Sequence, residues 1–574
     1  MTAAASAPGS AWAPLRYPVF RAIFIAQIAS NIGSMMHNVG AAWLMGDLNS
    51  SPTLVALVQT ATMLPVFLVG LPAGALADIM DRRRLLIITQ LCMTATTAAL
   101  AIATFADAVT APLLLLLTFV LGLGGAFTIP AWQAIQPELV RRADLPQALA
   151  LGNTTFNVGR AIGPAIGGLI VAGAGAGWVF AVNAVSFLGV VGVLFGWRRT
   201  PASASNQPPE KLVGALRAGL RYGSNSIALR HVLVRSAAFI VPASALVTLL
   251  PVVARGPLGL GSGGYGVLLG CFGIGAAASA IVRPRIVARV PVDRLMMLAT
   301  AVVAAGLVVV GVVNNSLVVG STLLVVGAGW TLALTATGVA AQAALPAWVR
   351  ARGMGLWNLA VTGGVAIGSA MWGLVAGWRV DVAQEIAAAM LLVLFVLTRG
   401  YKLSSPDRLD MELAAVDAPN VSLLPRQTDG PVLVTVRYRV PADGLDLFSA
   451  EMRRVERQRR RTGARQWGLF HDLSDVEIVL ETYIVESWAE HLRQHDRTTN
   501  TDVTVLGDAR RYSIGEPEVS HLVSCYAGEV TRSRLRLRRH GSSRSSDPSS
   551  VPSSDPSSAV EELTEASGDR PGPL

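Results

Sequence analysis

The chain has 574 residues, of which 52% are hydrophobic and only 15% are charged. Soluble globular proteins carry about 25% charged residues, so this composition excludes a wholly soluble enzyme, a disordered protein and a coiled coil. The 56 glycines and the net charge of +10 instead fit a helical membrane protein, in which small residues let helices approach closely and basic residues mark the loops on one side.

Apolar stretches long enough to span a membrane dominate the first 402 residues. A hydrocarbon core about 30 Å thick needs roughly 20 residues per helix. Twelve such stretches lie near 20–45, 53–77, 85–106, 111–133, 149–173, 177–197, 232–254, 264–284, 295–313, 317–341, 353–377 and 382–398. We therefore expect an all-α polytopic membrane protein with an N-terminal tail at 1–15, a six-helix half at 16–197, a central cytoplasmic loop at 198–229 and a second six-helix half at 230–402.

Basic residues gather in alternate loops of this region. Residues 1–402 hold 25 Lys and Arg against 10 Asp and Glu, and the loops on one side carry nearly all of these cations, whereas the opposite loops offer only Arg255 and Arg379. Short loops rich in Lys and Arg stay in the cytoplasm. We therefore expect a bacterial inner-membrane protein with both termini in the cytoplasm, whose basic residues serve topology and not nucleic-acid binding.

The first predicted span carries a polar stripe. Gln27, Asn31, Ser34 and Asn38 are spaced 4, 3 and 4 residues apart, which places them on one helical face. Because such a face is unfavourable against lipid, it lines a central cavity or bonds to neighbouring helices. His37, which titrates near neutral pH, and Asp47 are the candidate proton-coupling residues on this span.

The loop after the second span combines a glycine, an acidic residue and a basic run. We expect Gly74 to permit close helix contact, and Asp78 to form a gating latch with the neighbouring Arg82 and Arg83. The alternative is a plain basic anchor that only fixes topology.

The fifth span holds the run Gly-Arg-Ala-Ile-Gly-Pro-Ala-Ile-Gly-Gly at 159–168. Gly159, Gly163 and Gly167 repeat every four residues and give one smooth face for helix packing. Pro164 frees a backbone carbonyl and bends the helix. Gly168 follows four residues later and ends the run.

Arg160 is the one basic residue predicted deep within a span. A charge there costs at least about 2.5–3.5 kcal/mol, so it is expected to face a cavity or a partner. Arg160 either contacts an anion or substrate, belongs to a coupling relay, or bonds to carbonyls freed near Pro164. Asn157 and Asn358 are further candidate polar points of the same cavity.

An internal duplication is visible in the sequence. Residues 131–141 parallel 340–350, and 153–169 parallel 358–374, six predicted spans later. A repeat of this kind indicates two related six-helix halves, and in two-half transporters the binding site lies near the bilayer midplane between them.

The C-terminal region has the composition of a soluble domain. After a linker at 403–430, residues 431–510 show the order β-α-β-β-α-β, with the last strand predicted at 503–506, and this order predicts a small cytoplasmic α+β ferredoxin-like domain. Residues 526–574 are rich in Ser, Pro, Asp and Glu, and we expect them to be disordered. Three scattered cysteines predict neither a disulfide framework nor a metal site.

Several of these stretches resemble the major facilitator superfamily. The loop 74–84 is similar to its glycine/aspartate/basic signature, from which Ile79 and Asp81 depart, and 159–168 looks like its Gly-x-x-x-Gly-Pro-x-x-Gly-Gly antiporter motif. Together with Asn-Ile-Gly at 31–33, Ala-Trp-Leu-Met at 42–45 and Ser-Pro at 51–52, they resemble the transmembrane secretion effector branch, which includes enterobactin-exporter-like proteins. The tail resembles the dimeric α+β barrels of the antibiotic-biosynthesis monooxygenase group.

This resemblance implies a major facilitator fold and proton-driven efflux. The expected function is secondary active export of a small drug-like or siderophore-like amphipathic molecule by proton antiport with rocker-switch alternating access. We expect no enzyme activity and no cofactor beyond the proton gradient, and a homodimer through the C-terminal domain. The alternatives are a proton-coupled importer and a membrane-anchored protein whose C-terminal domain is a monooxygenase-like enzyme.

Overall fold

A computed structural model describes residues 10–197, 212–287, 289–403, 410–414, 419, 421–422 and 425–524. Within these residues twelve helices are long and apolar enough to cross a membrane, which confirms the predicted number of spans. The first half consists of α1 (Pro18–Leu48), α2 (Pro52–Ile79), α3 (Arg82–Phe105), α4 (Ala111–Leu139), α5 (Leu145–Ala174) and α6 (Ala176–Gly196). The second half consists of α8 (Ile227–Arg255), α9 (Ser262–Val287), α10 (Val292–Val312), α11 (Ser316–Ala343), α12 (Arg350–Ala376) and α13 (Val380–Thr398).

Local sequence sets the helix ends. Prolines occupy the first turn of α1, α2, α4 and α5, where a missing backbone N–H is tolerated. The Asp81 side chain caps α3 by accepting a hydrogen bond from the Arg84 amide at 2.9 Å. Gly175, at φ 91°, lies alone between α5 and α6, because glycine adopts this backbone region without strain.

The two halves have the same internal packing. In the first half α1 packs on α5 and α6, α2 on α4, and α3 on α6; in the second half the counterpart pairs are α8 with α12 and α13, α9 with α11, and α10 with α13. A short 3-10 turn precedes the fifth helix of each half, η2 (Arg142–Asp144) and η3 (Ala347–Val349). This correspondence agrees with the duplication visible in the sequence.

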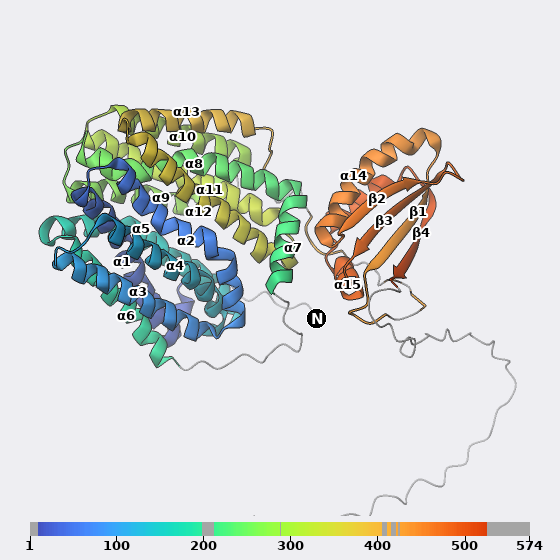
Figure 1. Ribbon diagram of the computed structural model, residues 1–574, viewed down its shortest axis with the longest axis horizontal. Coiled ribbons are helices and arrows are strands. Elements are labelled where there is room, and N and C mark those ends of the chain that lie inside the picture. The colour runs from blue at the N-terminus through green and yellow to red at the C-terminus, as the bar shows by residue number, and fades with distance from the viewer. Residues whose placement is uncertain are drawn as a thin grey trace, which may run out of the picture.

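The central segment contains a helix that the sequence analysis did not predict, α7 (Leu212–Asn225). It packs against the second half, where the Tyr222 hydroxyl donates a hydrogen bond to the Ala344 carbonyl at 2.9 Å and its ring is buried with Leu229, Leu345 and Val349. Figure 1 shows α7 at the end of the bundle that lies next to the C-terminal domain. We call this the domain end and the opposite one the distal end.

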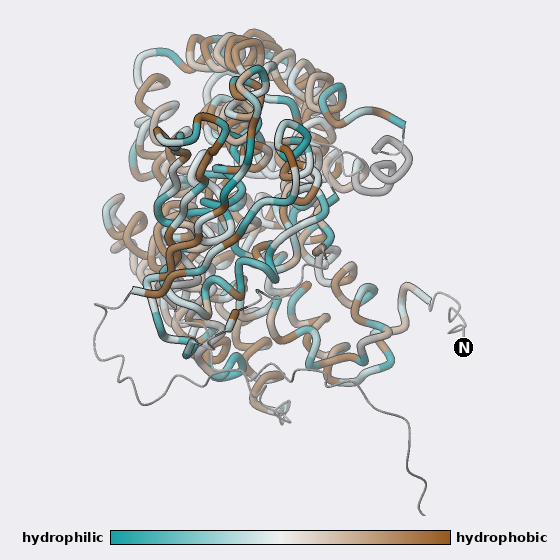
Figure 2. The backbone as a smooth tube through the Cα atoms, turned by 90° about the vertical axis from the view of Figure 1, so that its right-hand side faces the viewer, coloured by the Kyte–Doolittle hydropathy of each residue, from teal (hydrophilic) through white to brown (hydrophobic). Residues whose placement is uncertain are grey.

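A four-stranded antiparallel sheet forms the C-terminal domain. Its elements are β1 (Val432–Arg439), α14 (Leu445–Thr462), β2 (Gln466–His471), β3 (Ile478–Val485), α15 (Trp488–Asp496), α16 (Asn500–Arg510) and β4 (Ile514–Val523), and the strand order is β2-β3-β1-β4. In Figure 2 hydrophilic and hydrophobic residues are mixed along this domain, which faces the viewer, whereas the bundle behind it is mostly hydrophobic.

The prediction of a last strand at 503–506 was wrong, because these residues lie in α16. The Thr499 side chain accepts a hydrogen bond from the Asp502 amide, and Asp502 accepts one from the Thr499 amide, so a capping box starts this helix. The last strand is β4, which lies entirely beyond the predicted domain end at residue 510. The predicted disordered tail at 526–574 and part of the predicted linker lie outside the described residues.

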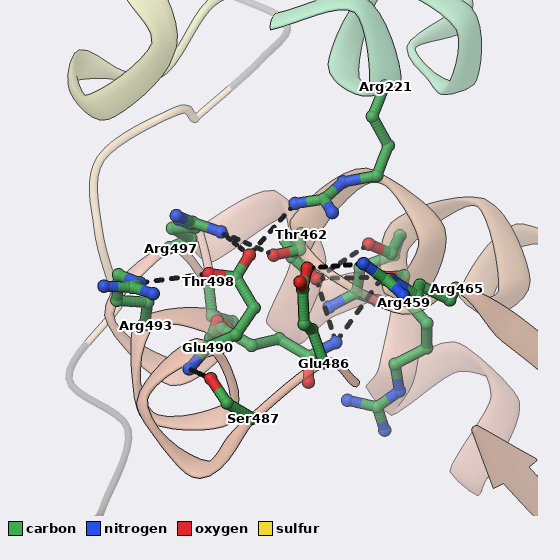
Figure 3. A network of polar contacts seen from close by, with 12 residues as sticks. Arg221, Arg459, Thr462, Arg465, Glu486, Ser487, Glu490, Arg493, Arg497 and Thr498 are labelled. Carbon is green, nitrogen blue, oxygen red and sulfur yellow. Dashed lines mark hydrogen bonds and ion pairs between the residues drawn. The ribbon is translucent and has the colours of Figure 1, made fainter. Parts of the chain in front are cut away.

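The C-terminal domain docks on α7 and η3 through charged and aromatic contacts. Figure 3 shows the polar network around Glu490, including Arg221 of α7. Glu490 of α15 accepts hydrogen bonds from Arg221 of α7 at 3.1 Å and from Arg497 at 2.6 Å. The Arg497 guanidinium also lies 4.6 Å from the ring centroid of Trp348 in η3, and Arg461 lies 5.5 Å from that of Tyr222. These contacts fix the domain to the second half.

Glu490 is the carboxylate on which this interface depends. Burial raises its pKa, but the guanidinium groups of Arg497, Arg221 and Arg493 outweigh burial and hold the pKa below its ordinary value. A lowered carboxylate pKa means that the charged form is favoured in the folded interface, so docking is complete at neutral pH and weakens as the pH falls through the lowered pKa.

Replacing Glu490 by Gln should therefore loosen the domain. The substitution removes the charge from an almost buried network, and we expect the docked state to lose about 1–3 kcal/mol. Hydrogen exchange in α7 of the full chain should accelerate by at least fivefold. Glu486→Gln is the matched control, because Glu486 pairs with Arg465 on the exposed surface of the same domain (Figure 3). Equal exchange in both variants would contradict a docking role for Glu490.

Candidate functional site

A cavity of about 220 Å³ lies between the two halves. Its wall is formed by Met35, Asn38, Ala42, Val55, Val58, Gln59, Thr62, Met63, Phe156, Arg160, Pro164, Ser244, Val247, Thr248, Pro251, Tyr265, Leu269, Phe272, Trp330 and Val365. These residues come from α1, α2 and α5 of the first half and from α8, α9, α11 and α12 of the second. The cavity therefore lies where a two-half membrane protein is expected to bind its ligand.

The wall is mostly apolar and aromatic, with a few polar side chains. Among the described lining residues Arg160 is the only charged side chain. Phe156, Tyr265, Phe272 and Trp330 supply the aromatic surface. Such a combination suits an amphipathic small molecule, because apolar walls bury its body and a few polar groups fix its orientation.

Arg160 lies where the backbones of α5 and α9 approach each other, because Gly273 of α9 packs directly on the Arg160 carbonyl group. Its Nη2 donates a hydrogen bond to the Thr331 hydroxyl of α11 at 3.2 Å, and its Cζ lies 5.7 Å from the ring centroid of Phe272. Its Nε is buried and has no hydrogen-bond partner among the described residues. The bond to Thr331 joins the two halves, so the predicted alternative of bonding to carbonyls near Pro164 does not describe this geometry.

The predicted stripe on α1 divides into two parts. Asn38 lines the cavity, whereas Asn31 donates a hydrogen bond to the Thr155 hydroxyl of α5 at 2.9 Å and accepts one from Gln27 at 3.5 Å. Gln27, Asn31 and Ser34 therefore lie outside the described cavity wall, toward the domain end. Of the other predicted polar points, Asn157 is half-buried and Asn358 is exposed, and the wall includes neither.

The glycines of the fifth span let α1 and α5 pack at backbone distance. A Cβ at Gly159 would lie 2.9 Å from the Asn31 carbonyl carbon, at Gly163 it would lie 2.9 Å from the Ile32 carbonyl oxygen, and at Gly167 2.8 Å from the Met36 Cα. Replacing any of these three glycines by a residue with a Cβ would therefore force α1 and α5 apart. Pro164, which lies between them, is part of the cavity wall.

Gly168 has a different role, because it faces the other half. A Cβ there would lie 2.6 Å from the Ser262 carbonyl oxygen and 2.8 Å from the Gly266 Cα of α9. Its counterpart in the repeat, Gly373 of α12, packs on Thr53 and Ala56 of α2, which is also a contact between halves. Both contacts lie toward the distal end of the bundle.

The distal ends of α1 and α8 are joined by an ion pair. The Arg255 guanidinium lies 2.6 Å from the Asp47 carboxylate and 4.2 Å from the ring centroid of Trp43. Asp47 therefore links the two halves and is not part of the described cavity wall. His37 is also absent from that wall: it is buried against Phe180, with ring centroids 4.8 Å apart, and neither ring nitrogen has a partner among the described residues.

The predicted gating loop makes its contacts within the first half. Arg82 donates hydrogen bonds to Glu138 and to the Ala134 carbonyl of α4, both at 3.0 Å, and Arg83 donates to carbonyls at the end of α6. The side chain of Asp78 lies outside the described residues. No described atom lies within 4 Å of a Cβ at Gly74, so the close helix contact predicted for this glycine is not seen among the described residues.

Several wall residues were missed by sequence reasoning. Thr62 on α2 and Ser244 and Thr248 on α8 contribute hydroxyl groups, and Thr248 shares a 2.7 Å hydrogen bond with Ser369. The repeat could have indicated the residues on α8. This helix is the counterpart of α1, so the polar stripe on α1 predicts polar residues on the corresponding face of α8. The aromatic wall had no such signal, since aromatic residues also face lipid.

Curated relatives of this chain include siderophore transport proteins. The staphyloferrin A transporter of Staphylococcus aureus is 25% identical over 293 residues, which cover 50% of this chain and 72% of that protein. The enterobactin exporter EntS of Escherichia coli is 27% identical over 396 residues, which cover 66% of this chain and 91% of that protein.

Solved structures with a similar fold include other transporters. The nucleoside transporter NupG matches with a TM-score of 0.57 at 12% identity, over 67% of this chain and 99% of NupG. An auto-inhibited peptide transporter of the POT family matches with a TM-score of 0.56 at 14% identity, over 70% of this chain and 99% of that chain. At these identities the likeness supports the fold alone.

A family model described as transmembrane secretion effector matches residues 9–529, which include both helical halves and the C-terminal sheet. The protein is therefore a multi-pass transporter and not an enzyme. With the duplicated twelve-helix bundle and the cavity between its halves, this match establishes that the chain belongs to the transmembrane secretion effector family of the major facilitator superfamily.

Proposed function

We propose that this protein exports a small amphipathic molecule of the siderophore-like class by rocker-switch alternating access. The observation that carries the proposal is the cavity between the halves, which is lined by aromatic residues and a few polar groups. The names of the curated relatives support a siderophore-like substrate, and the antiporter-like glycine motif on α5 favours export.

We also propose that the domain end faces the cytoplasm of a bacterial inner membrane. Arg82 and Arg83 begin α3 at this end and Arg141 lies in a connection there, whereas Arg255 and Arg379 are the basic residues at the distal connections. Positively charged short loops are retained in the cytoplasm, and this orientation places both the N-terminus and the C-terminal domain inside the cell.

For coupling, we propose proton antiport through Asp47. Because Asp47 of the first half pairs with Arg255 of the second at the distal end, its protonation would remove an attraction that holds this end together. Protons arriving from outside would thereby favour opening to the outside, and antiport requires each proton to be released to the cytoplasm before Asp47 pairs with Arg255 again. His37 is less suited to this role, because its ring is sealed between apolar neighbours.

The coupling proposal predicts uphill transport in inverted membrane vesicles. An imposed proton gradient should drive accumulation of enterobactin or staphyloferrin A at least fivefold above the level reached with an uncoupler. Arg160→Ala should abolish accumulation, because it removes the cation of the cavity, and Asp47→Asn should abolish its dependence on the gradient. Accumulation that is indifferent to the uncoupler would disprove proton coupling, and uptake only into right-side-out vesicles would indicate import.

Alternating access predicts a conformational effect of the glycine contacts between the halves. Gly168→Leu should push α5 from α9 and shift the population toward a state open at the distal end. Spin labels at positions 48 and 256 of a cysteine-free background should report a distance longer by several ångströms. Gly173→Leu is the control, because no described atom lies within 4 Å of a Cβ at this position on the same helix. The same distance in both variants would argue against a moving distal contact.

For the C-terminal domain, we propose a ferredoxin-like fold that pairs with a second copy. The order β2-β3-β1-β4 with antiparallel neighbours supports this fold. One face of the sheet is covered by its own helices. The other face carries an apolar group that includes Leu433, Phe470, Leu480, Ile484 and Leu522, and Phe470 and Leu522 are more than half exposed. Contiguous exposed apolar residues of this kind mark an interaction surface.

This pairing predicts a dimer that a single charge disrupts. Phe470→Glu should convert the full chain in detergent to a monomer, because it places a carboxylate on the apolar face of the sheet, at the edge strand β2. Light scattering coupled to size-exclusion chromatography measures the change. Leu473→Glu is the control, since Leu473 is 96% exposed in the turn between β2 and β3, away from this face. A monomeric wild-type protein would refute the proposal.

A further inference from the structure

The cavity contains a cation without a described anionic partner. Arg160 is the only charged side chain of the described wall, and the described ion pairs of both halves are formed elsewhere. A charge within a span normally faces a paired group or a water-filled cavity because isolation from both is costly. The geometry therefore leaves one positive charge to be neutralised by something that enters the cavity.

We propose that the cavity binds an amphipathic organic anion whose acidic group pairs with Arg160 and whose apolar body lies on the aromatic wall. This inference deepens the proposed function and rests on it, because it takes this cavity as the transport site. The substrate class follows from the chemistry of the wall: a carboxylate or similar oxyanion for the guanidinium, and an aromatic or aliphatic body for Phe156, Phe272 and Trp330.

Arg160 has donors available for such a group. The described hydrogen bond of its side chain uses Nη2 on the neutral Thr331 hydroxyl at 3.2 Å, and its buried Nε has no described partner. A guanidinium presents five N–H donors in a planar fork that matches an oxyanion. An incoming carboxylate can therefore form charge-assisted hydrogen bonds where the protein itself provides only one neutral acceptor.

Binding at this position also affects the contact between the halves. The hydrogen bond from Arg160 to Thr331 joins α5 of the first half to α11 of the second. An anion that takes the Nη2 donor replaces this bond with one to itself. Occupancy of the cavity thus changes a contact that the two halves share, which connects substrate binding to their relative motion.

The rest of the wall favours the anion over a cation. The other polar groups of the wall are neutral, including Asn38, Gln59, Thr62, Ser244 and Thr248, and the described wall includes no carboxylate. A cationic amphiphile would place its charge near Arg160 with no opposite charge to compensate. Like charges in a low-dielectric site repel strongly, so the cavity selects by charge as well as by apolar surface.

Matched probes of one shape test this inference. The purified full chain in detergent is dialysed against tritiated 2-naphthoate, 2-naphthamide and 2-naphthylmethylammonium, which are an anion, a neutral molecule and a cation. We expect naphthoate to bind at least tenfold more tightly than naphthamide, and the cation most weakly. Arg160→Gln should weaken naphthoate binding at least tenfold and leave naphthamide binding within twofold, whereas Arg160→Lys should retain part of the preference.

The neutral probe shows whether a variant remains folded, and Arg379→Gln controls for a cation at the distal surface. If Arg160→Gln loses both probes, Arg160→Lys decides: retained preference for naphthoate supports the proposal, and its loss overturns it. Equal binding of naphthoate and naphthamide to the wild-type protein also overturns it. Charge-selective binding without transport in vesicles would instead refute the proposed export and leave the anion site standing.

Discussion

Close approach of helix backbones is the constraint on which this molecule depends. Within each half a glycine-bearing fifth helix packs on the first: Gly163 of α5 lies against α1, and its repeat counterpart Gly368 of α12 lies against α8. Between the halves Gly168 and Gly373 occupy equivalent contacts on α9 and α2. Helices in lipid gain little from hydrophobic burial, so contact at this distance is what holds them together.

The same contacts explain how the bundle can hold a cavity and still move. Glycine surfaces are smooth, so a contact between halves separates without leaving unpaired polar groups. By contrast, two contacts between the halves are directional polar interactions, each of which is either formed or broken. They are the Asp47–Arg255 ion pair at the distal end and the Arg160–Thr331 hydrogen bond at the cavity. In the proposed mechanism, breaking these few polar links separates two arrangements of the halves, whose populations a ligand or a proton would bias.

The contacts described for the C-terminal domain connect it to the second half. Glu490, Arg497 and Arg461 reach α7 and η3, and α7 is itself packed on the second half through Tyr222. The described contacts therefore join the domain to the second half. Any partner that binds the open face of its sheet acts on that half, through a network of charges at the boundary between soluble and membrane parts.

Hydropathy and glycine spacing predicted the twelve spans, the packing face of α5 and a deep Arg160, because segment length, periodicity and small residues are local properties of the chain. The two related halves were predicted from the internal duplication, which a comparison of the sequence with itself reveals. The pairing of polar residues, by contrast, is not a local property and was not predicted from the sequence. Asn31 bonds to Thr155, whereas Asn38 lines the cavity. Asp47 pairs with Arg255, which lies about two hundred residues away in the sequence. The elements α7 and β4 were not predicted and became apparent only in the folded structure. Pairing across helices depends on their rotation and depth, which the folded bundle sets and no single segment encodes.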